Sequence, residues 1–327
     1  MESGMHRRTL LKLLAAAVLS PRITIAQSER KVPTVGIPLV YAGPDDALMV
    51  ALRKGLRDRG YVDGENIRLE HRFADGKIER LPALVRELAQ QKVDIFLAGA
   101  EPTARMQMQL SPATPIVLVA MGFDPVATGM IDSVGRPGGN ITGIYARTGD
   151  SVAKCVELLK ELRPGISNVA AYYDKWGQTE VKTVESSASA LGVRLLVSEL
   201  SAPYDYGAAF ANAKRNKAEG GIMTFSPRFY ADRKKVASSA LVQSFPVVSF
   251  DGSYPLAGGL LSYGPARTET WARAGYFIDR ILKGDKPGDL PMEEPRAYRM
   301  VVNLRTAKSL GLTVPESIMI RADEVVR

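Results

Sequence analysis

Histidine and cysteine, which build most nucleophilic and metal sites, are scarce in this sequence of 327 residues. It has two histidines, and because His6 lies near the N-terminus, His71 is alone in the body of the chain. His71 falls in an alternating apolar and polar run, which is typical of a surface strand. A histidine-based triad or a multi-histidine metal site needs more than this. We therefore expect no catalytic residue and no metal site.

The glycines and acidic pairs offer no alternative chemistry. No two glycines have G-x-G spacing, and the phosphate-loop and nucleophile-elbow patterns do not occur. The acidic pairs Asp45-Asp46 and Glu293-Glu294 fall in expected loops or helix starts, where capping and solvation explain them. The single cysteine, Cys155, excludes an internal disulfide, and its amphipathic surroundings predict a small core residue. No cofactor is expected.

A set of aromatic, charged and hydroxyl residues follows the predicted strands instead. The candidate ligand-binding residues are Tyr41, Ala42, Glu101, Thr103, Phe123, Asp124, Asp174, Trp176, Ser226, Asp251 and Tyr254. In open parallel sheets, ligands bind at the carboxyl ends of strands, close to helix N-termini whose free N–H groups attract anions. Rings beside a few polar groups suit a small amphipathic molecule. For any single residue, loop or hinge packing explains its position equally well.

Strand-like and helix-like segments alternate along the chain and must position these residues. Strands are predicted over 32–40, 66–73, 93–98, 115–121, 141–145, 169–173, 193–200, 221–225 and 247–250, and helices over 45–60, 78–91, 101–110, 151–163, 179–191, 206–216, 228–243 and 267–282. This alternation predicts parallel sheets with right-handed crossovers. Because 66–104 and 194–231 share one layout, we expect an α/β protein with two Rossmann-like lobes.

The charge of the chain is mildly positive. Residues 1–26 hold four of the 43 basic and one of the 35 acidic residues, which leaves a net charge of +5 beyond them. This excess is spread out without a Lys/Arg run, so we expect no nucleic-acid partner.

Residues 1–26 have the pattern of an export signal. Arg7-Arg8 precede Leu10–Leu19, an apolar run too short to span a bilayer. Thr24-Ile25-Ala26 places small residues where a signal peptidase needs them, so we expect cleavage after Ala26 and a periplasmic protein. The paired arginines fit twin-arginine export, but general-secretion signals also carry them, and both routes stay open.

Several stretches resemble the ABC transporter substrate-binding family related to tryptophan- and tyrosine-binding proteins. They are 81–84 with 93–95, 124–126 through 136–143, 259–265, and 302–312 through 321–325. The resemblance implies a type I periplasmic-binding-protein fold. Its first lobe would take 32–146 and about 250–288, and its second lobe about 147–249 and 289–327.

The resemblance also implies a function. It indicates the periplasmic solute-binding subunit of an ABC uptake transporter, without enzymatic activity. The expected partners are a small amphipathic solute, with an aromatic amino acid or related carboxylate favoured, and an inner-membrane ABC permease. A monomer is expected. A secreted enzyme on the same fold and a sensory protein that presents its ligand remain alternatives.

Two loops depart from the family pattern. Members often have a serine-bearing loop after the first strand, where this chain has Tyr41-Ala42-Gly43-Pro44. They often have Asn-Pro repeats after the first strand of the second lobe, where this chain has Asp174-Lys175-Trp176-Gly177. Because both loops are expected to face the ligand, the aromatic solute is implied by the family alone.

Overall fold

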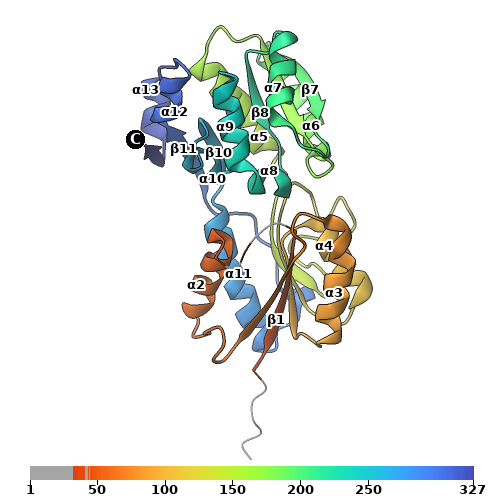
Figure 1. The fold of residues 1–327 in the computed structure, drawn as a ribbon. Coiled ribbons are helices and arrows are strands. Elements are labelled where there is room, and N and C mark those ends of the chain that lie inside the picture. The colour runs from red at the N-terminus through yellow and green to blue at the C-terminus, as the bar shows by residue number, and fades with distance from the viewer. Residues whose placement is uncertain (1–31, 41–42, 44) are drawn as a thin grey trace, which may run out of the picture. The chain divides into compact units, whose positions relative to one another are not determined.

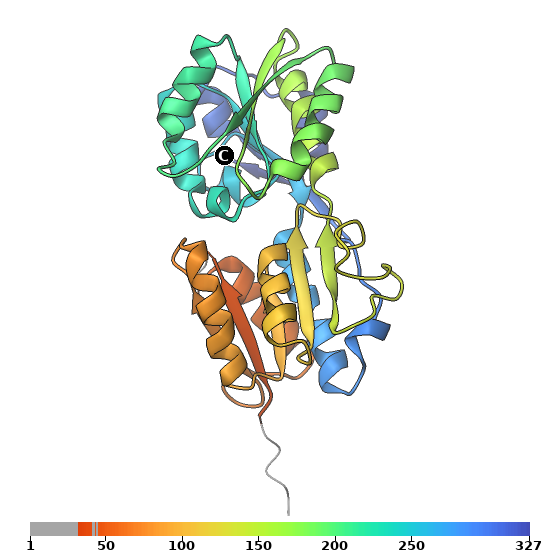
Figure 2. The same ribbon diagram turned by 90° about the vertical axis from the view of Figure 1, so that its right-hand side faces the viewer.

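The structure is a computed structural model that describes residues 32–40, 43 and 45–327. The predicted export signal with its cleavage site, and the candidate residues Tyr41 and Ala42, lie outside the described residues. Residues 33–327 contain two β-sheets, and each sheet has helices on both of its faces (Figures 1 and 2). This arrangement confirms the predicted α/β class with two mostly parallel sheets.

The first sheet is fully parallel, with the order β2-β1-β3-β4-β5. Its strands are β1 (Thr34–Leu39), β2 (Arg68–Phe73), β3 (Ile95–Ala98), β4 (Ile116–Met121) and β5 (Ile141–Ala146). The helices are α2 (Ala47–Arg57) and α11 (Arg267–Leu282) on one face, and η1 (Ile78–Arg80), α3 (Leu81–Gln90) and α4 (Glu101–Leu110) on the other. Alternate strand residues therefore enter two separate cores, as expected for a sheet covered on both faces.

Helices α2 and α11 lie side by side with their backbones in contact (Figure 1). A methyl group added to Gly55 of α2 would lie 1.9 Å from the carbonyl oxygen of Ala272, and one added to Gly275 of α11 would lie 2.7 Å from the Gly55 carbonyl carbon. Only glycine permits this approach.

The second sheet has the order β12-β11-β10-β9-β8-β6-β7 and is parallel except where β10 pairs with β11. Its strands are β6 (Asn168–Tyr173), β7 (Arg194–Glu199), β8 (Gly220–Met223), β9 (Val247–Ser249), β10 (Leu261–Pro265), β11 (Tyr298–Asn303) and β12 (Glu324–Val326). The helices that accompany this sheet are α5 (Gly149–Leu162), η2 (Gln178–Glu180), α6 (Val181–Ala190), α7 (Tyr206–Arg215), α8 (Pro227–Ala231), α9 (Arg233–Val242), α10 (Ser253–Leu256), α12 (Leu304–Ser309) and α13 (Glu316–Arg321). The short helix η3 (Pro287–Asp289) contacts β5 and belongs with the first sheet.

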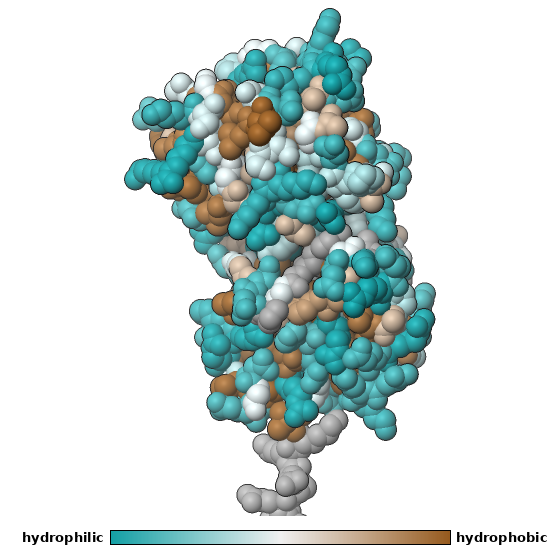
Figure 3. Space-filling model, in the orientation of Figure 1, coloured by the Kyte–Doolittle hydropathy of each residue, from teal (hydrophilic) through white to brown (hydrophobic). Residues whose placement is uncertain are grey.

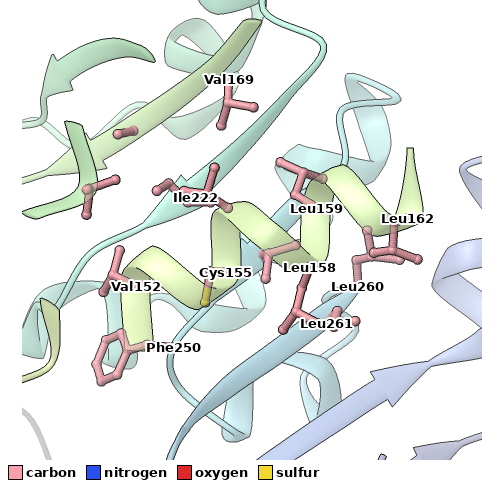
Figure 4. Packing of buried hydrophobic residues seen from close by; sticks show 14 of the residues in the cluster. Val152, Cys155, Leu158, Leu159, Leu162, Val169, Ile222, Phe250, Leu260 and Leu261 are labelled. Carbon is pink, nitrogen blue, oxygen red and sulfur yellow. The ribbon is translucent and has the colours of Figure 1, made fainter. Parts of the chain in front are cut away.

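Helix α5 forms the centre of one core of the second sheet (Figure 4). Its apolar residues, which include Val152 and Leu159, face Val169, Ile222 and neighbouring strand residues. Cys155 lies among them and is fully buried, which confirms the prediction of a core cysteine. Burial raises the pKa of its thiol to about 12, so the thiol is protonated and inert at neutral pH.

The sheets divide the chain differently from the predicted lobe boundaries. Strand β10 lies in the second sheet between β9 and β11, whereas we assigned all of 250–288 to the first lobe. Conversely, Leu290 accepts a hydrogen bond from Thr142, and the carbonyl of Glu293 accepts one from the Tyr145 N–H, so this segment belongs with the first sheet. The chain therefore crosses between sheets near residues 147, 266 and 295. Which sheet β10 joins depends on the strands with which it pairs, and the hydrophobic period of its own residues does not indicate those strands.

Most predicted elements appear within a few residues of their predicted bounds. The helix predicted over 228–243 is instead two helices, α8 and α9, which meet at Asp232. The carboxylate of Asp232 accepts hydrogen bonds from the Tyr206 hydroxyl and the Arg228 guanidinium, which fixes the break. His71 lies in the edge strand β2, as predicted.

The face of the molecule seen in Figure 3 is mainly polar. In the view of Figure 3 the hydrophilic side chains dominate, and the apolar ones form separate small patches. Among the described helices, none combines the length and apolar character that a membrane span requires.

Candidate functional site

Asp174 and Ser226 form one hydrogen-bonded unit at the carboxyl ends of β6 and β8. The Asp174 carboxylate accepts hydrogen bonds from the Ser226 hydroxyl at 2.6 Å, from the Tyr204 hydroxyl at 3.3 Å and from the Trp176 N–H at 3.0 Å. Asp174 is buried, and this burial raises its pKa despite the three donors. Ser226 also caps α8 by accepting the N–H of Arg228. The two loops are therefore locked in one geometry.

Trp176 lies where side chains of both sheets meet. Its partly buried ring packs against the core cluster around α5 in the second sheet. It also packs against a small cluster of first-sheet residues that includes Val40, Leu81 and Leu84. The ring thus provides an apolar wall beside the Asp174–Ser226 unit.

Phe123 and Asp124 border a cavity of about 340 Å³. Its lining residues are Gly122, Phe123, Asp124, Arg147, Thr148, Gly149, Asp150, Glu180 and Thr183. The Phe123 ring is buried in a core of the first sheet, and Asp124 accepts the N–H groups of Val126 and Ala127. The cavity therefore takes residues from the loops after β4 and β5, from the start of α5, and from η2 and the start of α6.

Glu180 is the residue that the sequence analysis missed. One oxygen of its buried carboxyl, Oε2, accepts the Phe225 N–H at 2.9 Å, and Oε1 has no hydrogen-bond partner among the described residues. Burial raises its pKa to about 8, and the nearby Asp174 adds to the effect. In the sequence, an acidic residue at a helix start is explained by dipole stabilisation in solvent, so nothing marked it as buried.

Asp251 lies in a second polar group beside another cavity, of about 320 Å³. Its carboxylate pairs with Arg267 at 2.6 Å and accepts two hydrogen bonds from Ser253. Burial is the largest single effect and opposes ionisation of Asp251. The charge of Arg267 together with the hydrogen bonds from Ser253 and Arg267 outweighs it and holds the Asp251 pKa below its usual value. The Arg267 guanidinium stacks 4.4 Å from the ring centre of Tyr230, whose hydroxyl donates to Asp46 at the start of α2.

The other predicted residues have different surroundings. Glu101 begins α4 and pairs with Arg105 at 2.8 Å, and Thr103 is buried in the first turn of the same helix. Tyr254 is a core residue of the second sheet. It borders a gap of about 10 Å³ together with Ser226 and Asp251, which is too small for a solute. Within the described residues, no three His, Cys, Asp or Glu side chains lie close enough to hold a metal ion.

Two mostly parallel sheets, with helices on both faces and several chain crossings between them, define a type I periplasmic binding protein. Residues 39–326 match the family described as ABC transporter substrate binding protein, and the chain belongs to this family. Both findings confirm the predicted fold and the family resemblance.

Relatives of known structure or function share this fold at low identity. The tyrosine-binding protein of Clostridioides difficile (strain R20291) is 22% identical over 289 residues, which cover 86% of this chain and 82% of that protein. A conserved domain protein from Vibrio cholerae has a TM-score of 0.82 at 24% identity, over 90% of this chain and 100% of that one. The ABC domain from Streptococcus pneumonia in complex with L-Trp has a TM-score of 0.80 at 22% identity, over 90% and 99%.

A more distant relative binds an aromatic acid. The solute binding protein RPA0668 from R. palustris, in complex with benzoate, has a TM-score of 0.52 at 16% identity and covers 78% of this chain and 75% of that one. Its match to the family model makes the chain a substrate-binding protein of an ABC transporter, a class of protein that binds small molecules and works with a permease.

Proposed function

We propose that this substrate-binding protein captures an aromatic amino acid or a related aromatic carboxylate between the carboxyl-end loops of its two sheets. The observation that carries the proposal is Trp176, whose ring contacts clusters of both sheets directly beside the Asp174–Ser226 unit. A flat solute can stack on such a ring while polar groups around it fix its orientation.

The names of the relatives support the aromatic class. One is a tyrosine-binding protein, and two others are complexes with L-Trp and with benzoate. An aromatic ring with a carboxylate is common to all three molecules. We propose the same chemistry for the solute of this chain.

The start of α4 is the proposed position of the solute carboxylate. Ala100 is the N-cap residue of α4, and no side chain caps the helix there. The first-turn N–H groups and the helix dipole favour an anion. Thr103 lies in this turn, and the charge of Glu101 is balanced by Arg105.

A thermal-shift and calorimetric screen tests the proposed solute class. The protein without residues 1–26 is titrated with L-phenylalanine, L-tyrosine, L-tryptophan, benzoate and 4-hydroxybenzoate, with L-leucine and L-alanine as matched aliphatic controls. At least one aromatic compound should bind with one-to-one stoichiometry. At a hundredfold excess over its Kd, it should stabilise the fold by about 2.7 kcal/mol. Binding of the aliphatic controls alone would refute the aromatic class.

We also propose that the chain is exported, is cleaved after Ala26 and acts as a monomer with an inner-membrane permease. The support is the Arg7-Arg8 pair and the apolar run Leu10–Leu19. N-terminal sequencing of protein from the periplasmic fraction should begin at Gln27. An intact Met1 on soluble cytoplasmic protein would contradict the proposal.

A further inference from the structure

Two buried polar atoms without partners line the same cavity of about 340 Å³. They are Glu180 Oε1 and the hydroxyl oxygen of Thr148, and neither has a hydrogen-bond partner among the described residues. Both residues are almost fully buried, with 3% and 1% of their surfaces exposed. Because buried polar atoms are nearly always hydrogen-bonded, two unpartnered oxygens beside one cavity point to a molecule in the cavity as their hydrogen-bonding partner.

The charges around this cavity disfavour an anion. Asp124 and Asp150 line it beside the neutral carboxyl of Glu180, and Arg147 is the one basic residue among the lining side chains. The Arg147 guanidinium lies 3.9 Å from Asp124 and also donates to Glu294 at 3.4 Å, so two carboxylates share its charge. The cavity therefore has an excess of negative groups, and a cation is the favoured ligand.

The carboxyl of Glu180 lies close to Gly122, in the loop that follows β4 of the first sheet. A methyl group on Gly122, which follows β4, would lie 3.4 Å from Glu180 Oε1 and 2.9 Å from the Phe225 ring. Gly122 also has a φ of +82°, which disfavours any larger residue there. The free oxygen thus faces the end of the first sheet, on the side where the solute is proposed to bind.

We propose that this cavity binds an organic ammonium group, with Glu180 Oε1 and the Thr148 hydroxyl as the acceptors of its hydrogen bonds. An ammonium has three N–H donors and no acceptor, which matches two unpartnered oxygens in an acidic setting. Two sources share this chemistry, the α-amino group of a captured amino acid and a separate amine. In the first case the inference rests on the proposed function, and in the second it does not.

Binding of a cation here must release a proton. Glu180 Oε2 accepts the Phe225 N–H, so in the empty protein the proton of the neutral carboxyl is on Oε1. The charged groups that face Glu180 are Asp174 from the end of β6 and the cavity residues Asp124, Arg147 and Asp150. The ammonium forms an ion pair with the carboxylate, the O–H bond of the carboxyl breaks, and its proton passes to the buffer.

The number of protons released can be estimated from the burial of Glu180. A carboxyl with a pKa of about 8 is about 90% protonated at pH 7 and about 10% protonated at pH 9. Because the ammonium compounds are themselves fully protonated at pH 7, each should release about 0.9 proton from Glu180 on binding at that pH.

The test compares matched trios of compounds by isothermal titration in phosphate and HEPES buffers, whose ionisation enthalpies differ and neither of which carries a primary ammonium group. Each trio contains an amino acid, its decarboxylated amine and its deaminated acid, namely phenylalanine, phenethylamine and phenylpropionate, with the tryptophan and tyrosine series alongside. Glu180→Gln keeps the acceptor for the Phe225 N–H and the size of the side chain. Glu185→Gln, on the exposed face of α6, is the matched control.

We expect ammonium-bearing compounds to bind with proton release, and Glu180→Gln to weaken them at least tenfold while Glu185→Gln leaves them unchanged. Binding of phenethylamine without binding of any amino acid or acid would support this inference and defeat the proposed aromatic solute. Deaminated acids that bind as tightly as the amino acids, in wild type and Glu180→Gln alike, would overturn this inference and leave the proposed function intact. Absence of binding by every ammonium compound would also overturn it.

Discussion

Replacement of Glu180 by glutamine should flatten the dependence of stability on pH. In the unfolded chain this carboxyl ionises near its usual pKa of 4.5, whereas in the folded protein burial raises the pKa to about 8. Between these values the folded state keeps a proton that the unfolded state has lost. The contribution of the protonated carboxyl to stability is therefore complete below about pH 4.5 and is lost as pH rises to about 8.

The pKa difference sets the size of this effect. One pKa unit corresponds to about 1.4 kcal/mol, so ionisation of Glu180 costs the folded state about 5 kcal/mol at most by pH 8. Relaxation around the carboxylate lowers this figure, and we expect a change of about 2–4 kcal/mol between pH 5 and pH 8. Glutamine does not ionise, and it retains the hydrogen bond from the Phe225 N–H.

Urea denaturation, monitored by far-UV circular dichroism at several pH values from 5 to 9, measures the effect. The quantity of interest is the unfolding free energy of Glu180→Gln minus that of the wild type, because the other titrating groups cancel in this difference. It should rise between pH 5 and pH 8 and level off above. Glu185→Gln should show no such rise. A difference that is constant across this range would refute the assignment of Glu180 as a buried, protonated acid.

Three further predictions concern packing and the binding site. Gly55→Ala should destabilise the fold by about 1–3 kcal/mol in urea denaturation, because the added methyl would lie 1.9 Å from a backbone oxygen of α11; Gly207→Ala, with its nearest neighbour at 3.5 Å, should be neutral or stabilising by about 0.5–1 kcal/mol, and equal losses would contradict the close helix approach. Ligand binding should change the intrinsic fluorescence mainly through Trp176, because the Trp271 ring is buried in the first-sheet core. The change should vanish in Trp176→Phe and persist in Trp271→Phe, and the reverse result would show that the proposed binding site is wrong. Thr103→Val should weaken binding of an aromatic amino acid by about 1 kcal/mol in calorimetry, and an unchanged Kd would remove Thr103 from the site.

The sequence was a good guide to the first sheet because its strands and helices differ strongly in period. The strands are short runs buried on both faces, such as β4, in which all six residues are buried. Helices such as α2 repeat leucines at Leu48, Leu52 and Leu56, and all three are buried as a stripe. Such patterns arise from which residues of a single helix or strand are buried, and the spacing of apolar residues in the sequence indicates this burial.

Features that depend on distant partners were not predictable. The membership of β10 in the second sheet depends on pairing with β9 and β11, and the sequence analysis predicted no strand for β10, β11 or β12. The break between α8 and α9 depends on the contact of Asp232 with Tyr206. Neither hydrophobic period nor turn residues carry this information.

The candidate site shows the same division. The rule that ligands meet the carboxyl ends of strands selected Asp174 and Ser226, and the structure joins them by a hydrogen bond. Sequence reasoning missed the link from Asp251 to Arg267 and the unpartnered oxygen of Glu180. Predicting either feature requires knowing which side chains lie together in the folded protein. From the sequence alone, a charged residue is expected on the solvated surface.

A crystal structure of the protein with the best-binding aromatic compound of the screen tests the central claim most directly. The account predicts density for the solute between the carboxyl-end loops of the two sheets, with its ring on Trp176 and its carboxylate at the first turn of α4. Solute density in the cavity beside Asp251 and Arg267, with the Trp176 ring free of contact, would contradict it.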